Sequence, residues 1–169
     1  MSPRIHLIEG PVGSGKSTIA GILSEENRAP KLLLDKWMKT LFSPDRPETN
    51  SVSWYIERKE RCILQIMNIA HEILNSGSDV VLELGLIQQS LREQIYDLVE
   101  KIDFPMKIYV VDAPKEVRRQ RVVNRNIEKG ETYSMEVSEE IFEFANSMWE
   151  SIDESECRDF EVEYISTSE

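Results

Sequence analysis

The sequence of 169 residues contains only two cysteines, which is too few for a disulfide framework. It has no apolar run close to the roughly 20 residues of a membrane-spanning helix. It also begins without the long apolar region and small-residue cleavage site of a secretory signal. We therefore expect a protein of the reducing cytoplasm that has no membrane partner.

Positive charge is scarce as well. The chain has 20 Lys and Arg against 31 Asp and Glu, which gives a net charge of −11. Residues 131–169 carry 13 of the acids and a single base, so the rest of the chain is nearly neutral. A basic surface for nucleic acid is therefore not expected. No internal repeat divides the sequence, and its length suits one domain over residues 1–169.

Short apolar runs alternate with helical patterns along the chain. The expected strands cover residues 4–9, 31–34, 79–84, 107–111 and 160–165. Apolar spacings of three and four predict helices over 16–27, 36–42, 54–75, 90–101, 114–125 and 136–154. Such alternation predicts an α/β domain in which helices cover both faces of a parallel sheet.

A glycine-rich segment separates the first expected strand from the first expected helix. It fits the pattern G-x-x-x-x-G-K-[ST] in full, with the residues Gly10, Pro11, Val12, Gly13, Ser14, Gly15, Lys16, Ser17 and Thr18. The glycines let successive N–H groups face an anion, and the helix N-terminus adds its positive end. We expect Lys16 to reach the β- and γ-phosphates of a nucleotide and the Ser17 hydroxyl to bind Mg²⁺.

The motif alone does not separate a kinase from an ATPase. The sequence has no Asn-Lys-x-Asp stretch to recognise guanine, so a GTPase is not indicated. The other reading of the segment, a glycine turn with a chance lysine, does not account for the full pattern in its context.

Acidic residues lie at the ends of the expected strands, where ligands bind in an open α/β sheet. Asp35 could accept the proton of a phosphate-acceptor hydroxyl, or it could cap the helix that follows. Glu83 stands in an otherwise apolar run and needs a partner there. It could hold Mg²⁺, bind a substrate hydroxyl or pair with a nearby base. Asp112 is expected to form a turn or cap before Pro114.

Three arginines with spacings of three and four share one helix face, namely Arg118, Arg121 and Arg125. They precede a polar segment, which suits a lid over about residues 118–135 that closes over ATP. We assign charge neutralisation to Arg121 and Arg125. For Arg118, a solvated face with Glu128 as its partner is an equal alternative.

Trp37 and Met38 stand next to Asp35 and could form the wall of an acceptor pocket. The alternative for both residues is the hydrophobic core, which is the commoner place for such side chains.

In these segments the sequence resembles the small P-loop kinase-like ATP-binding proteins. This group includes chloramphenicol phosphotransferase, zeta toxins and the kinase domain of polynucleotide kinases. The resemblance covers nearly the whole chain. Besides the glycine-rich segment, it rests on residues 34–38, 80–85 and 121–126. It departs from the group at Glu83, where close relatives often have Asp, at residues 86–88, which lack aromatics, and at 149–156, which lack prolines.

The resemblance implies a P-loop NTPase fold with a five-stranded sheet of order 2-3-1-4-5 and a small lid. It also implies transfer of the γ-phosphoryl group of Mg-ATP to a hydroxyl, with Asp35 as the base. We therefore expect a kinase for a small molecule, in which Glu83 contacts the metal or the substrate. The alternatives are a polynucleotide 5′-hydroxyl kinase and a nucleotide-binding regulatory or toxin-like protein without small-molecule turnover.

Overall fold

The computed structural model describes residues 2–129 and 136–167. Its strands are β1 (Ile5–Glu9), β2 (Lys31–Leu33), β3 (Val80–Glu83), β4 (Met106–Asp112) and β5 (Glu161–Ser166). All of them pair in parallel, in the order β2-β3-β1-β4-β5. The expected fold class and strand order are confirmed.

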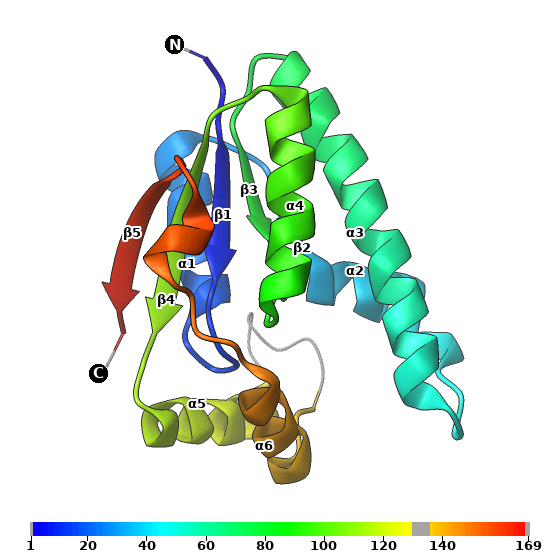
Figure 1. Ribbon diagram of the computed structural model, residues 1–169. Coiled ribbons are helices and arrows are strands. Elements are labelled where there is room, and N and C mark those ends of the chain that lie inside the picture. Colours follow the sequence, from blue (N-terminus) through cyan, green and yellow to red (C-terminus); the bar gives the residue numbers. More distant parts are fainter. Residues whose placement is uncertain (1, 130–135, 168–169) are drawn as a thin grey trace.

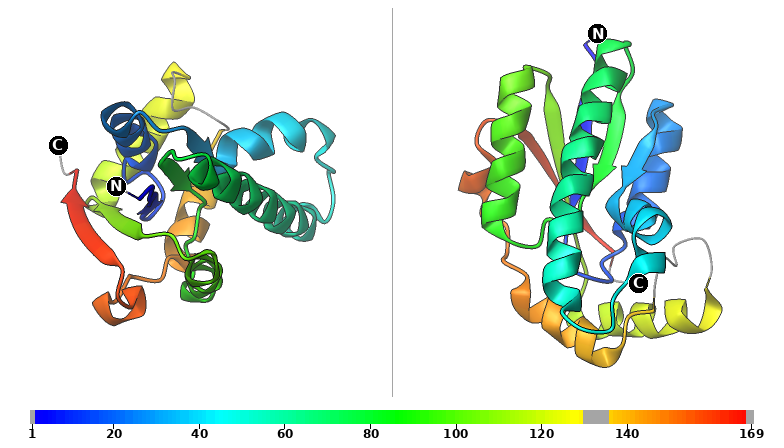
Figure 2. Two further views of the ribbon diagram at one scale, coloured as in Figure 1. Left: turned by 90° about the horizontal axis from the view of Figure 1, so that it is seen from above. Right: turned by 90° about the vertical axis from the view of Figure 1, so that its right-hand side faces the viewer.

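Helices cover both faces of this sheet (Figure 2). On one face lies α1 (Lys16–Asn27), and on the other lie α3 (Ser51–Asn75) and α4 (Gln89–Ile102). Every residue of β1 is buried because both of its faces are covered, which explains its apolar residues Ile5, Leu7 and Ile8. Ile5 and Leu7 pack toward α3 and α4, whereas Ile8 packs toward α1.

The other helices lie around the carboxyl ends of the strands (Figure 1). They are α2 (Leu34–Leu41), α5 (Lys115–Glu128) and α6 (Glu139–Met148), with short 3₁₀ turns at Ser43–Asp45 and Glu154–Cys157. None of the helices in the described ranges is long and apolar enough to cross a bilayer.

Several predicted boundaries differ from those in the structure, and two of these differences affect the site or the segment next to it. The strand expected over residues 31–34 ends at Leu33, so Asp35 lies in the first turn of α2. The single helix expected over residues 136–154 is instead α6 followed by an extended segment. The backbone leaves the helix at Trp149 because the Glu150 N–H donates to the Ile87 carbonyl at 2.8 Å.

A buried ion pair holds this C-terminal segment against α4. The Arg92 Nε atom lies 2.8 Å from Glu156 Oε2, and both side chains are excluded from solvent. The same guanidinium donates to the carbonyl oxygens of Leu86 at 3.1 Å and Glu150 at 2.8 Å. Arg92 therefore joins α4, the loop after β3 and the segment that leads into β5.

We predict that Glu156→Ala lowers the free energy of unfolding by about 3–5 kcal/mol, because it leaves the Arg92 charge buried without its partner. Urea denaturation checks this. Glu154→Ala, an exposed position in the same turn, is the matched control and is expected to change little. A loss below about 1 kcal/mol for Glu156→Ala would contradict the prediction.

Candidate active site

The glycine-rich segment forms a tight loop between β1 and α1. Gly13 and Gly15 have positive φ angles of 79° and 103°, which glycine adopts without strain. Gly10 has no room for a side chain, since a Cβ atom there would lie 2.1 Å from the Val111 carbonyl oxygen. Gly15 is the N-cap of α1 and provides no side-chain cap, so the first N–H groups of α1 stay available for an anion.

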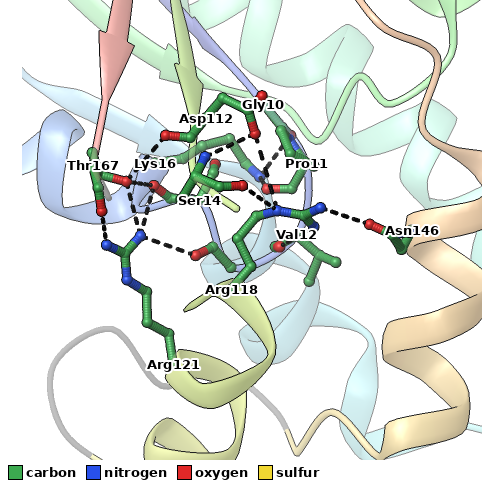
Figure 3. Close-up of polar contacts among 12 residues, drawn as sticks. Gly10, Pro11, Val12, Ser14, Lys16, Asp112, Arg118, Arg121, Asn146 and Thr167 are labelled. Atoms are coloured by element: carbon green, nitrogen blue, oxygen red, sulfur yellow. Dashed lines mark hydrogen bonds and ion pairs between the residues drawn. The ribbon is translucent and has the colours of Figure 1, made fainter. Parts of the chain in front are cut away.

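Lys16 folds back over this loop (Figure 3). Its ammonium donates to the carbonyl oxygens of Gly10 at 2.8 Å and Pro11 at 2.9 Å, and it lies 3.9 Å from Glu83 Oε1. Burial lowers the pKa of Lys16, and the neighbouring Glu83 and Asp35 carboxylates oppose this shift. Lys16 is therefore the nearby base with which Glu83 pairs, which was one of the alternatives that the sequence left open for Glu83.

Two arginines of α5 hold the loop from outside (Figure 3). Arg118 is buried and donates to the carbonyl oxygens of Ala113 at 2.9 Å and Val12 at 3.1 Å. The solvated-face alternative for Arg118 is therefore wrong. Arg121 donates to the Ser14 carbonyl at 3.2 Å and the Thr167 hydroxyl at 2.8 Å. Both side chains therefore tie α5 to the loop.

One cavity of about 640 Å³ opens above the loop, a size typical of small-molecule sites. Its walls come from the loop, from α2, α3 and α5, and from α6. Of the predicted site residues, it is lined by Val12, Gly13, Ser14, Gly15, Lys16, Ser17, Thr18, Asp35, Met38, Glu83, Arg121 and Arg125.

Three predicted site residues lie outside the cavity lining. Gly10 and Pro11 contribute carbonyl oxygens to Lys16. Trp37 is partly buried against the core, and Met38 is buried in the core although it also borders the cavity, so the core alternative is confirmed for both residues. Trp37 stands two positions after Asp35 and so points to the other side of α2, whereas Met38, three positions on, shares the face of Asp35. Residues 130–135 of the expected lid lie outside the described residues.

The carboxylates and cations in the cavity shift one another's pKa values. Burial raises the pKa of Glu83 to about 7, against the opposing effect of the Lys16 charge. Burial also lowers the pKa of the Arg125 guanidinium, and Asp35 and Glu83 act in the opposite direction. Arg125 therefore faces the same two carboxylates as Lys16.

The sequence reasoning missed several lining residues on α3 and α6. Lys59 lies three and four residues before the buried Cys62 and Ile63, which puts it on the apolar face of α3. A charge on that face was the signal for a functional side chain. Further missed lining residues include Tyr55 on α3, Ile141, Phe144 and Ala145 on α6, and Arg46 in the loop after α2. Trp54 also lines the cavity, in agreement with the aromatic pocket wall that the sequence suggested.

The chain belongs to the AAA_33 family of AAA domains, which matches residues 5–148. No curated protein matches the sequence. The fold is that of the P-loop kinases, in agreement with the resemblance seen in the sequence.

Several solved structures share this fold. A candidate kinase of Chloroflexus aurantiacus has a TM-score of 0.75 and 18% identity, over 99% of this chain and 90% of that one. Chaetomium thermophilum Kti12, solved with ADP-AlF3, has a TM-score of 0.70 and 15% identity, over 97% and 88%. A gluconokinase of Sinorhizobium meliloti has a TM-score of 0.58 and 15% identity, over 99% and 85%.

We predict that Gly10→Ala weakens ATP binding more than tenfold, because the new methyl group displaces the loop from Val111. Calorimetric titration with ATP measures this. Gly21→Ala is the matched control, since its Cβ would have only the Lys31 ammonium nearby, at 3.7 Å. In the middle of α1, alanine should stabilise the fold by about 0.5–1 kcal/mol and leave ATP binding unchanged. Equal ATP affinity in both variants would contradict the assignment of the loop.

Glu9, the last residue of β1, lies behind the loop in a buried polar cluster. Both of its carboxyl oxygens are 3.0 Å from the Tyr96 hydroxyl. Burial raises the pKa of Glu9 from its ordinary value of 4.5 to about 8. The Tyr96 hydroxyl and the Arg92 charge lower the pKa of Glu9, but the effect of burial outweighs both.

A raised carboxyl pKa stabilises the fold below pH 4.5, and this contribution is lost as the pH rises toward 8. We therefore predict that Glu9→Gln loses less stability than the parent protein between these two pH values. Urea denaturation over this pH range tests it, with Glu25→Gln on the exposed face of α1 as the control. Parallel stability curves for the parent protein and Glu9→Gln would refute the prediction.

Proposed function

We propose that this protein is a kinase that transfers the γ-phosphoryl group of ATP to a hydroxyl of a small molecule. The observation that carries the proposal is that Lys16, Asp35 and Arg125 line one cavity. A phosphate-binding loop, a carboxylate and a lid-side cation thus face the same space. The chain belongs to the AAA_33 family, and solved kinase structures share its fold, which supports the same reaction.

In this proposal the loop N–H groups and Lys16 hold the β- and γ-phosphates. Lys16 must leave the carbonyl oxygens of Gly10 and Pro11 to do so, and phosphate oxygens replace these partners. Arg125 neutralises the charge of the migrating phosphoryl group. Arg121 keeps the loop in place through its carbonyl contacts and borders the same cavity.

Asp35 receives the proton of the acceptor hydroxyl. The bond between the acceptor oxygen and the γ-phosphorus forms as the bond from that phosphorus to the bridging oxygen of ADP breaks. The proton passes to the Asp35 carboxylate, and ADP leaves with the bridging oxygen. Asp35 lies in the first turn of α2, and the N-terminal end of a helix stabilises a negative charge.

The residues present fit a magnesium ion that arrives with the nucleotide. The described residues hold no group of three or more His, Cys, Asp or Glu that could bind a metal alone. Mg²⁺ often relies on one or two protein oxygens together with substrate phosphates. The Ser17 hydroxyl and the Glu83 carboxylate, which both line the cavity, are the candidates. The ion would neutralise phosphate charge.

We predict that Asp35→Asn lowers phosphoryl transfer by roughly 10²- to 10⁴-fold with little change in ATP affinity, because the acceptor proton loses its base. Lys16→Ala should abolish both binding and transfer. Mass spectrometry of pooled hydroxylated metabolites, incubated with protein, ATP and Mg²⁺, measures the gain of one phosphate. Asp45→Asn, exposed and outside the cavity lining, is the control.

The same screen includes an oligonucleotide with a 5′-hydroxyl end. Its phosphorylation in place of any small molecule would favour the polynucleotide kinase. Tight ATP binding without transfer to any acceptor would favour a nucleotide-binding regulator. Full transfer activity in Asp35→Asn would overturn the assignment of the base.

A further inference from the structure

The part of the cavity beyond the phosphate loop contains a lysine without a carboxylate partner. The half-buried Lys59 ammonium donates to the Gly85 carbonyl at 2.8 Å. An ammonium carries three hydrogens, so this contact uses one of them. Among the residues that the structure describes, no carboxylate forms an ion pair with Lys59. The side chain therefore keeps donor capacity in the cavity.

The two acidic residues near Lys59 already have other partners or roles. Asp35 and Glu83 both raise the pKa of Lys59, although burial lowers it overall. Glu83 is paired with Lys16 at 3.9 Å, and Asp35 is the proposed base for the acceptor hydroxyl. A positive charge in a half-buried position is unfavourable without a counter-ion. Since neither carboxylate pairs with Lys59, a bound molecule is the remaining source of that counter-ion.

A second cation stands on the same side of the cavity. Arg46, which follows the turn after α2, lines the cavity and is exposed. Its charge opposes the burial effect on the pKa of Tyr55, which places Arg46 near that side chain. Tyr55 lies one helical turn before Lys59 on α3. Within the described ranges, the Arg46 guanidinium makes no ion pair.

We propose that the phosphate acceptor carries an anionic group, a carboxylate or a phosphate, which Lys59 and Arg46 bind while its hydroxyl faces Asp35. This inference rests on the proposed kinase function and narrows its substrate class to hydroxylated acids. Lys59 is then the residue that determines specificity at the inner end of the cavity. Arg46 supplies the second contact at the rim.

Matched pairs of acids and neutral alcohols test this proposal. The pairs are gluconate with sorbitol, pantothenate with panthenol, and ribose 5-phosphate with ribose, each incubated with the protein, ATP and Mg²⁺. We expect transfer to the acidic member of at least one pair, with kcat/KM at least tenfold above that of its neutral partner. The carboxylate and phosphate pairs distinguish the two kinds of anion.

Lys59→Met should lower kcat/KM for that acid by roughly tenfold to a hundredfold, mainly through KM, since a charged hydrogen bond is lost. Lys59→Arg should restore much of it. ATP affinity should stay within about twofold of the parent value, since Lys59 lies outside the loop. Lys36→Met, an exposed position of α2 outside the cavity lining, is the control.

Several results would overturn the proposal. A neutral alcohol phosphorylated as well as its acid would refute the inference and leave the kinase function intact. Equal loss for both members of a pair in Lys59→Met would also refute it. No phosphate transfer to any acceptor would contradict the inference and the proposed function together. If Lys59→Met does not fold, Lys59→Gln and the comparison of pairs in the parent protein decide the question.

Discussion

Parallel pairing brings the ends of β1, β3 and β4 to one edge of the sheet, and every element of the site depends on this register. Ile8 of β1 pairs with Glu83 of β3 and with Tyr109 of β4. The phosphate loop leaves β1 at this level, and the Val111 carbonyl of β4 lies directly against Gly10. A shift of one residue would turn every side chain to the opposite face and separate Lys16 from Glu83.

Backbone carbonyl oxygens, more than carboxylates, hold the cations around the site. Lys16, Arg118, Arg121 and Lys59 all donate to carbonyl groups of loops that follow strands. A carbonyl oxygen orients a cation without cancelling its formal charge. Within the described part of the chain, the cavity lining holds six Lys and Arg residues against three acidic residues, although the chain as a whole carries a net charge of −11.

The acidic C-terminal quarter has identifiable partners within the fold. Glu143 of α6 contacts both Lys115 and Arg119 of α5. The Asn126 side chain donates to the Val137 carbonyl and accepts from the Val137 N–H. These contacts fix α6 beside α5, and α6 in turn supplies Ile141, Phe144 and Ala145 to the apolar part of the cavity lining. Further along the chain, Glu156 neutralises Arg92, and Glu161 and Glu163 lie near Lys107.

Much of the fold follows from local pattern. Strands buried on both faces are rich in apolar residues, so β1, β3 and β4 were recognisable from their short apolar runs, although His6 interrupts the first and Lys107 the last. Pattern alone extended a helix to residue 154, because nothing in the sequence reveals that the Glu150 N–H bonds to Ile87. The same limit applies to Trp37, whose direction depends on where α2 begins.

The sequence by itself determined the phosphate loop, because the positive φ angles at Gly13 and Gly15 are a local requirement that glycine meets. It also determined the alternation of strands and helices that produces the parallel sheet. Only the tertiary structure showed that Lys59 of α3 and the apolar side chains of α6 line the same cavity. Lys59 is 24 residues from Glu83 in the sequence, and Ile141 is 125 residues from Lys16, yet all of them line one space. Packing of α3 and α6 around the strand ends brings them together, and sequence spacing carries no record of that packing.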